Sequence, residues 1–395
     1  MKSEWQTVRA ADFMDFNPRL SIKKGTVATK ISMDKLRPFT KAVPSVEQAE
    51  FSGGTKFANG DTIMARITPC LENGKTAFVD CLRENEIAFG STEFIVLRAK
   101  PGVSDPQFVY YLATSPEFRN VAIKSMVGSS GRQRVQQPVL ENLELTVPKL
   151  PEQEKIGHFL AELDDKIALN ERVNDNLEQQ AQAIYHERFE TVSPNDLPSD
   201  WRIVTLGEVA TISNKSFNPL KEPEILLEHY SIPAFDEVRF PVFELSTSIK
   251  SNKFIIDASC FMISKLNPTT KRVWKPYCLT GNAVCSTEFI VYKAKDKTIT
   301  DFLYSVIDSN SFSDFMCSHV TGSTGSRQRT TPSDTLSYEL ILPSEDELAE
   351  FQSLVSPMYA QIRINAIEND RLKRLRDSLL PKLMSGEIDV STIQL

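Results

Sequence analysis

Two long segments of the chain carry mostly apolar residues, with two asparagines in each, at alternating spacings of four and three residues. This spacing predicts helices that bury a narrow seam against a partner helix, as in coiled coils, rather than a broad amphipathic face. The first seam comprises Ile156, Leu160, Leu163, Ile167, Asn170, Asn174, Leu177, Ala181 and Ile184. The second comprises Phe351, Val355, Met358, Ile362, Asn365, Asn369, Leu372, Arg376 and Leu379, each 195 residues later. The chain is therefore expected to contain a pair of related helices.

Local signals set the limits of the second helix. Ser344 and Glu347 have the spacing of a capping box at its start, and Gly386 is suited to end it. Pro357 lies inside the seam. Because an interior proline lacks an N–H and clashes with the preceding turn, we expect this helix to break near Ser356.

The segments that precede the two helices are also repeated. The hexapeptide Ser-Thr-Glu-Phe-Ile-Val occurs at residues 91–96 and again, unchanged, at 286–291. The tripeptide Arg-Gln-Arg occurs at residues 132–134 and 327–329, in each case after a Gly/Ser loop. Motifs that return in the same order at one offset indicate an internal duplication.

Each repeated segment has the pattern of a mixed α+β domain. Alternating apolar residues predict strands at 93–97, 143–147, 288–292 and 338–342, and helical spacing predicts short helices at 105–114 and 299–307. We therefore predict two tandem α+β domains, at 1–150 and 196–343, followed by helical segments at 151–195 and 344–395. The two helices are expected to form an antiparallel, coiled-coil-like pair related by a pseudo-twofold axis.

Composition places the chain among globular proteins. Of its 395 residues, 41% are hydrophobic and 25% are charged, and no apolar run approaches the roughly 18 residues of a membrane span. Residues 1–16 contain too many charges for a signal peptide, so we expect a cytoplasmic protein without a membrane partner. Reduced core thiols are expected for the six cysteines, Cys70, Cys81, Cys260, Cys278, Cys285 and Cys317.

The net charge of −7 argues against a general nucleic-acid binder. The charge is unevenly distributed, however, because residues 1–150 carry a net +4 and residues 151–196 carry −7. Acidity is thus concentrated in a predicted helix, and a polyanionic partner remains compatible with the rest of the chain.

Motifs for covalent chemistry are missing from the sequence. It contains no phosphate loop ending in Gly-Lys-Ser/Thr, no G-x-G-x-x-G and no Asn-Pro-Pro-aromatic tetrapeptide. Asp164, Asp165 and Lys166 match the end of a nuclease signature, but they lie on the first predicted helix, where we expect a solvated face. Histidines and cysteines lack the spacing of a metal site. We therefore predict no catalytic residue and no metal site.

The ordered motifs resemble the specificity subunit of a type I restriction-modification system. The resemblance rests on the duplicated hexapeptide, the Gly/Ser loops before basic residues, residues 145–156, residues 197–201 and the closing residues 382–388. It implies two target-recognition domains that each read half of a bipartite site in double-stranded DNA. It also implies two methyltransferase (modification) subunits that bring S-adenosylmethionine, and restriction/translocase subunits that use ATP, with no cofactor in this chain.

Residues shared by both copies are poorly suited to reading different bases and better suited to phosphate contacts or to the fold. We predict DNA contacts from the two repeated loops and from one isolated cation in each half. These residues are Gly128, Ser129, Ser130, Gly131, Arg132, Gln133 and Arg134; Gly322, Ser323, Thr324, Gly325, Ser326, Arg327, Gln328 and Arg329; and Arg66 and Lys265. The alternative is that arginine–carboxylate pairs tie each loop to its own domain, with Glu93 and Glu288 as candidate partners. Base-reading residues are expected in the non-repeating stretches, around 23–41 and 217–253.

The seam asparagines provide a test of the helix pairing. In an antiparallel pair with pseudo-twofold symmetry, Asn170 faces Asn369 and Asn174 faces Asn365. A buried Asn pair costs stability but specifies register. The alternative is that these side chains occupy solvent-facing edges of the helices.

Two other functions compete with DNA recognition. The duplicated helices are also compatible with a protein-interaction scaffold that has no role in DNA readout. A stand-alone nuclease or methyltransferase is disfavoured by the missing motifs.

Overall fold

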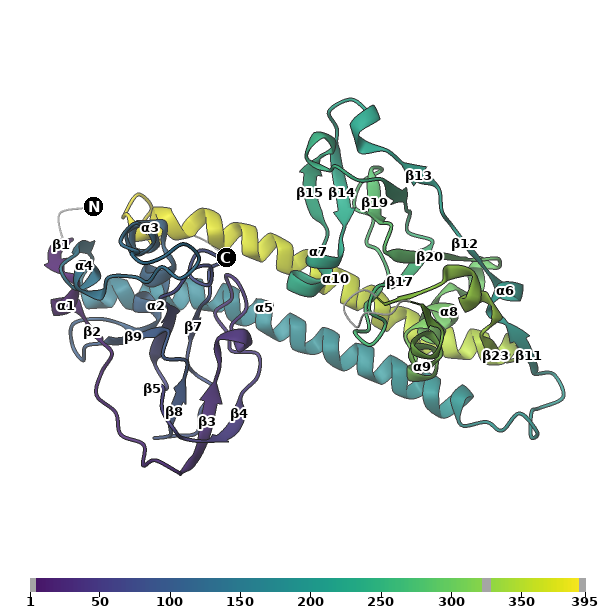
Figure 1. Ribbon diagram of the computed structural model, residues 1–395, viewed down its shortest axis with the longest axis horizontal. Helices are drawn as coiled ribbons and strands as arrows, with labels where there is room; N and C mark the ends of the chain where they lie inside the picture. Colours follow the sequence, from purple (N-terminus) through teal and green to yellow (C-terminus); the bar gives the residue numbers. More distant parts are fainter. Residues whose placement is uncertain (1–4, 322–327, 391–395) are drawn as a thin grey trace. The chain divides into compact units, whose positions relative to one another are not determined.

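The computed structural model describes residues 5–321 and 328–390 and divides into two compact units. Unit 1 comprises residues 1–170 and 368–395, and unit 2 comprises residues 171–367. The boundaries fall inside the two long helices, α5 (Leu150–Tyr185) and α10 (Glu345–Met384) (Figure 1). Each unit therefore contains one globular part and a portion of both helices.

Unit 1 contains two four-stranded sheets and a separate strand pair. The first sheet has the antiparallel order β2 (Met14–Phe16), β9 (Phe94–Ala99), β6 (Asp61–Ala65), β7 (Thr76–Phe78). The second has the order β4 (Glu47–Glu50), β3 (Val27–Ile31), β8 (Ile87–Gly90), β5 (Thr55–Ala58). The pair is β1 (Gln6–Arg9) with β10 (Glu144–Val147). The helices are α1 (Ala10–Phe13), η2 (Met33–Lys35), α2 (Pro106–Thr114), α3 (Pro116–Lys124) and α4 (Gln137–Glu141).

Unit 2 repeats this plan. Its first sheet has the order β12 (Ala210–Ile212), β20 (Phe289–Ala294), β17 (Cys260–Ser264), β18 (Val273–Trp274). The second has the order β13 (Ser216–Phe217), β16 (Lys253–Ile255), β19 (Ala283–Ser286), β14 (Leu226–Tyr230), β15 (Val242–Leu245). The strand pairs are β11 (Arg202–Thr205) with β23 (Glu339–Leu342), and β21 (Val320–Thr321) with β22 (Arg329–Thr330). The helices are η3 (His186–Glu190), α6 (Leu206–Val209), η4 (Pro219–Lys221), α7 (Ile232–Val238), η5 (Ser246–Ser248), η6 (Lys297–Ile299), α8 (Thr300–Ile307), α9 (Asn310–Ser318) and η7 (Pro332–Ser337).

The duplication of topology extends beyond the duplication of sequence. In unit 1, β3 pairs in parallel with β8, and β14 does the same with β19 in unit 2. Both β3 and β14 lie in stretches where the two halves show no visible sequence similarity. The α+β fold predicted twice from the sequence is therefore confirmed, and the structure adds a second sheet to each copy.

Hydrophobic packing joins each globular part to the long helices within its unit. In unit 1, Phe108 and Phe118 from α2 and α3 share a buried cluster with Leu160 of α5 and Leu383 of α10. In unit 2, Phe302 of α8 shares a buried cluster with Tyr185, Phe189 and Phe351. Each globular part thus packs against helical residues of its own unit.

One of the two hydrogen bonds of the predicted capping box of α10 and the predicted glycine at its end are present, but the predicted break is not. Ser344 Oγ accepts a hydrogen bond from the Glu347 N–H at 3.4 Å, and Gly386 adopts a left-handed φ of 67° just after the last turn. The helix continues through Pro357, so the expectation of a break near Ser356 is wrong. Both Pro357 and Ser353, whose carbonyl loses its helical partner, are exposed, so water can satisfy that carbonyl.

The six cysteines are free thiols, but most are not core residues. Cys260 and Cys285 are buried, whereas Cys81 is exposed and the other three are intermediate. The expectation of core thiols therefore holds for Cys260 and Cys285 and is wrong for the other four, most clearly for Cys81, which follows β7 in a loop. Over residues 5–321 and 328–390, no helix is long and apolar enough to span a membrane.

Candidate nucleic-acid interface

The first Gly/Ser loop forms an exposed hairpin in unit 1. Val127 and Arg134 exchange backbone hydrogen bonds of 3.0 and 2.9 Å and close the hairpin. Gly128 and Gly131 adopt φ values of 138° and 77°, which favour glycine, and residues 128–132 are all exposed. The hairpin therefore presents several backbone N–H groups and the Arg132 side chain to solvent, a combination suited to an anion.

The base of this hairpin is fixed by an ion pair. Arg134 donates to both oxygens of Glu93, with Nε–Oε distances of 3.0 Å and an Nη2–Oε1 distance of 2.7 Å. The hydrogen bonds from Arg134 lower the pKa of the Glu93 carboxyl below its ordinary value. Arg134 thus anchors the hairpin, which is the arrangement considered as the alternative to phosphate contact.

The second hairpin has the same base in unit 2. Strands β21 and β22 pair Thr321 with Arg329, and Arg329 donates to both oxygens of Glu288 at 3.0 Å. The tip residues predicted to contact DNA, Gly322, Ser323, Thr324, Gly325, Ser326 and Arg327, lie outside the described residues. Gln328 is described and follows this tip.

The bases of the two hairpins are held by equivalent backbone hydrogen bonds. The N–H of Arg66 donates to Glu93 O, and the N–H of Lys265 donates to Glu288 O, both at 2.9 Å. Two further hydrogen bonds are equivalent in the two units. Thr68 N donates to Gln133 O as Asn267 N does to Gln328 O, and Val135 N donates to Arg66 O as Thr330 N does to Lys265 O. The antiparallel pair of Val127 with Arg134 has its counterpart in the pair of Thr321 with Arg329. Arg66 and Lys265 therefore occupy equivalent positions beside the two hairpin bases.

The basic residues at the two hairpins differ in whether a carboxylate of the chain already neutralises their charge. Within the described part of the chain, Arg132 is exposed and has no ion-pair partner, whereas Arg134 and Arg329 each hold a glutamate. Arg66 is half-buried; its Nη2 approaches Val135 O at 3.5 Å, and its Nε is buried without a hydrogen-bond partner. Among Arg66, Arg132, Arg134 and Arg329, Arg132 thus has the charge most available to a phosphate.

The long helices are antiparallel in each unit, and the seam asparagines pair as the pseudo-twofold symmetry predicts. In unit 1, Asn170 Nδ2 donates to Asn369 Oδ1 at 2.9 Å and to Glu368 at 2.7 Å. In unit 2, Asn365 Nδ2 donates to Asn174 Oδ1 at 2.8 Å. Asn170, Asn365 and Asn369 are buried, and Asn174 is half-buried.

Asp164 does not lie on a solvated face, contrary to the expectation from its sequence context. Its side chain is 6% exposed, accepts a hydrogen bond from Tyr111 Oη at 2.7 Å and forms an ion pair with Arg376 of α10. Burial by itself would lower the pKa of Arg376, but Asp164 and Asp377 raise it. The sequence hid this pair because the two residues lie 212 positions apart.

Further ion pairs, which the sequence analysis did not predict, connect the globular part of each unit to α5. In unit 1, Lys41 is 4% exposed and binds Asp165 at 2.9 Å, so it is unavailable for base reading. In unit 2, Arg239 after α7 binds Glu178 at 2.9 Å. No sequence signal distinguished Lys41 from the other lysines near it.

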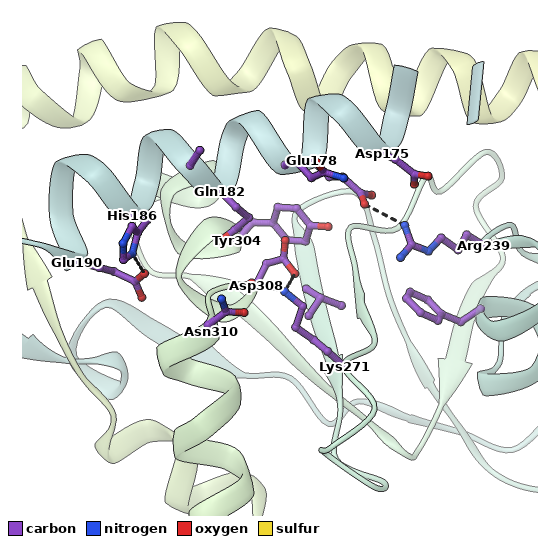
Figure 2. A pocket seen from close by; sticks show the side chains of 14 residues that line it. Asp175, Glu178, Gln182, His186, Glu190, Arg239, Lys271, Tyr304, Asp308 and Asn310 are labelled. Carbon is purple, nitrogen blue, oxygen red and sulfur yellow. Dashed lines mark hydrogen bonds and ion pairs between the residues drawn. The ribbon is translucent and has the colours of Figure 1, made fainter. Parts of the chain in front are cut away.

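The Arg239–Glu178 pair lines a polar cavity of about 520 Å³ in unit 2 (Figure 2). Lys271 and Asp308 pair across the same cavity at 3.0 Å. Burial raises the pKa of Glu178 and of Asp308, although each has a basic partner. The charges of Glu178, Arg239, Lys271 and Asp308 are thus paired within unit 2. None of the residues that line the cavity belongs to either Gly/Ser hairpin.

Each half of the described chain thus carries an Arg–Glu ion pair at the base of a Gly/Ser loop, on one copy of the same α+β topology. Residues 2–179 match the family model described as the Type I restriction modification DNA specificity domain. The chain is 23% identical to the HindI specificity subunit of a type I restriction enzyme from Haemophilus influenzae, over 83% of this chain and 86% of that protein. It is 24% identical to the MjaIX specificity subunit from Methanocaldococcus jannaschii, over 73% and 70%.

A solved structure has the same fold. The crystal structure of the S subunit of a type I restriction-modification system from M. genitalium aligns with a TM-score of 0.54 and 15% identity, over 96% of each chain. The chain is thus similar to specificity subunits of type I restriction enzymes, and its residues 2–179 match the DNA specificity domain of such systems.

Proposed function

We propose that the chain reads a two-part target in double-stranded DNA and holds two methyltransferase subunits and the restriction subunits of a cytoplasmic type I complex. In this proposal residues 1–150 and 196–343 are target-recognition domains, and residues 151–195 and 344–395 are helical spacers. The observation that supports this proposal is that both halves have the same topology and hold the base of a Gly/Ser hairpin by equivalent backbone hydrogen bonds.

The roles of the hairpin residues follow from their contacts. We propose that Arg132 and the exposed N–H groups of residues 128–131 bind phosphate, and that residues 322–327 do so in the other half. Arg134 and Arg329 hold the hairpins in place through Glu93 and Glu288. Arg66 and Lys265 provide positive charge beside the hairpin bases. Residues common to both halves then position the DNA, and residues that differ read its bases.

The test is a double substitution, Arg132→Ala with Arg327→Ala, in the chain complexed with its methyltransferase. We expect weaker binding to every DNA sequence, because phosphate contacts are independent of sequence. Loss of two phosphate contacts should also reduce the slope of log K against log salt by about 1.8, at about 0.9 per contact. Fluorescence anisotropy on matched and scrambled duplexes from 50 to 300 mM salt would measure both effects.

A matched control separates local contact from general loss of charge. Arg172 is exposed on α5 and has no ion-pair partner among the described residues. Arg172→Ala should leave the salt slope unchanged. An unaltered slope in the double variant would refute the phosphate role of the hairpins.

The two-part target has its own test. Co-expression with the methyltransferase, followed by single-molecule sequencing of the host genome, should reveal methyladenine at a gapped motif. A continuous motif, or no methylation despite a stable complex, would support the scaffold function instead.

A further inference from the structure

The two long helices are nearly interchangeable along their seams. Asn170 and Asn174 of α5 are equivalent to Asn365 and Asn369 of α10 at the offset of 195 residues. If α5 paired with α5 of a second copy in the same register, Asn170 of one copy would face Asn174 of the other. The asparagine pairs, like the apolar seam residues, therefore also permit pairing between identical helices, although an α5–α5 pair would lack the hydrogen bond from Asn170 to Glu368.

One buried contact breaks this equivalence. Asp164 of α5 pairs with Arg376 of α10, and both residues are 7% exposed. Their equivalents in unit 2 are Tyr359 and Ala181, which are uncharged and share a buried cluster. Tyr359 Oη instead shares a hydrogen bond of 2.8 Å with Ser305 of α8. A charged contact at this position thus exists only in unit 1, among the residues that the structure describes.

Pairing between identical helices would separate the two charges. In an α5–α5 pair, Asp164 would face Ala181 of the second copy, and in an α10–α10 pair, Arg376 would face Tyr359 of the second copy. The first arrangement buries Asp164 without a counter-ion, and the second leaves Arg376 with only Asp377, a neighbour on its own helix whose side chain is 63% exposed. Removing one member of a buried ion pair is strongly destabilising because the remaining charge is desolvated without compensation.

We propose that the Asp164–Arg376 pair selects pairing of α5 with α10 over pairing between identical helices of two copies. The asparagines fix the register, and the ion pair fixes the identity of the partner helix. Where the proposed DNA function holds, this selection has a consequence: each helix pair carries two different recognition domains, so the two half-sites of a target differ. The selection itself requires no DNA and can fail independently of that function.

The test neutralises the pair in the full chain. Asp164→Asn with Arg376→Met removes both charges while retaining an oxygen that can accept the Tyr111 hydrogen bond. Asp164→Glu with Arg376→Lys is the control, because it changes both side chains but keeps opposite charges. Each protein is unfolded, refolded at micromolar concentration and measured by light scattering coupled to size exclusion. Circular dichroism checks folding, and if the neutral double variant does not fold, Asp164→Asn alone replaces it.

The wild type and the control are expected as monomers, and the neutral variant is expected to form a species with twice the mass of one chain. Cross-linking of mixed ¹⁴N- and ¹⁵N-labelled neutral variant should join Lys166 of one copy to Lys166 of the other, about 18 Å apart along the helix axes in this register. A neutral variant that remains monomeric would overturn the proposal. So would equal dimerisation of the control, or cross-links between copies that join α5 only to α10, since exchange of helices between copies preserves the charged contact.

Discussion

Replacing the buried asparagine pair of unit 1 with leucine tests whether polar seam residues fix the register at a cost in stability. The perturbation is Asn170→Leu with Asn369→Leu, at positions 3% and 6% exposed. The wild-type amides make three side-chain hydrogen bonds: to Glu368 at 2.7 Å, between the two asparagines at 2.9 Å and to Ile167 O at 3.3 Å. The double variant removes all three and leaves no asparagine amide buried in this contact.

The expected gain is the difference between two opposing contributions. Two buried leucine side chains contribute about 3–6 kcal/mol at about 1.5–3 kcal/mol each. Three lost hydrogen bonds cost about 3 kcal/mol at about 1 kcal/mol each. The double variant should therefore be more stable by up to about 3 kcal/mol. For a unit of this size that corresponds to a rise in melting temperature of about 2–4 °C per kcal/mol.

The single variants give the reasoning its sharpest test. Asn170→Leu alone leaves the Asn369 Oδ1 buried without its donor, which costs about 1–3 kcal/mol. The double variant should therefore be more stable than either single variant, with a coupling energy of at least about 1 kcal/mol in a double-mutant cycle. Calorimetry measures the stabilities, and hydrogen exchange along α5 and α10 reports added registers as faster, heterogeneous exchange.

The pair in unit 2 is a matched control. Asn174 is half-buried, so Asn174→Leu with Asn365→Leu should stabilise less. Equal stability of the unit 1 double variant and the wild type, together with coupling below about 0.5 kcal/mol, would refute the pairing argument.

Three further predictions follow from individual contacts. Glu93→Gln should speed hydrogen exchange of the first hairpin, because it removes the ion pair with Arg134. Arg134 lowers the pKa of Glu93, so this ion pair is fully formed above the ordinary carboxyl pKa and is lost as pH falls through the lowered value. Hydrogen exchange measured between pH 6 and 3 would show the loss. Burial lowers the pKa of His229, so protonation favours the unfolded chain and stability should fall as pH drops below about 6.5; His229→Gln should flatten this dependence in thermal melts. Pro357→Ala restores an N–H for the Ser353 carbonyl and should raise stability by about 2–3 kcal/mol in calorimetry, whereas no change would show that the proline is already accommodated.

Periodic and local signals predicted the long elements well. The seam spacing located α5 and α10, cap signals located the ends of α10, and alternation located β9, β10, β20 and β23 to within two residues. These signals are readable because neighbouring residues of one helix or strand share one packing environment. The expectation that proline breaks a helix failed at Pro357. The cost of a proline inside a helix depends on whether the Ser353 carbonyl can reach water and on the packing of the buried residues Val355 and Tyr359, and neither can be read from the local sequence.

The candidate site was only partly predictable. The repeat identified the two loops and their arginines, but it left open whether Arg134 meets phosphate or Glu93, because the carboxylate lies 41 residues away in the chain. The structure pairs Arg134 and Arg329 with glutamates and leaves Arg132 exposed. Lys41, inside a stretch expected to read bases, is buried against α5.

The sequence by itself determined the duplication, the helix seam and the pairing of the asparagines, because repeats and heptads are recorded in residue spacing along one chain. Only the tertiary structure decided which polar residues are buried and which charges they meet. Asp164 has the same local context as a solvent-facing carboxylate, and it is buried because folding brings Tyr111 and Arg376 to it. Burial and ion pairing depend on contacts between distant segments, and no local pattern encodes such contacts.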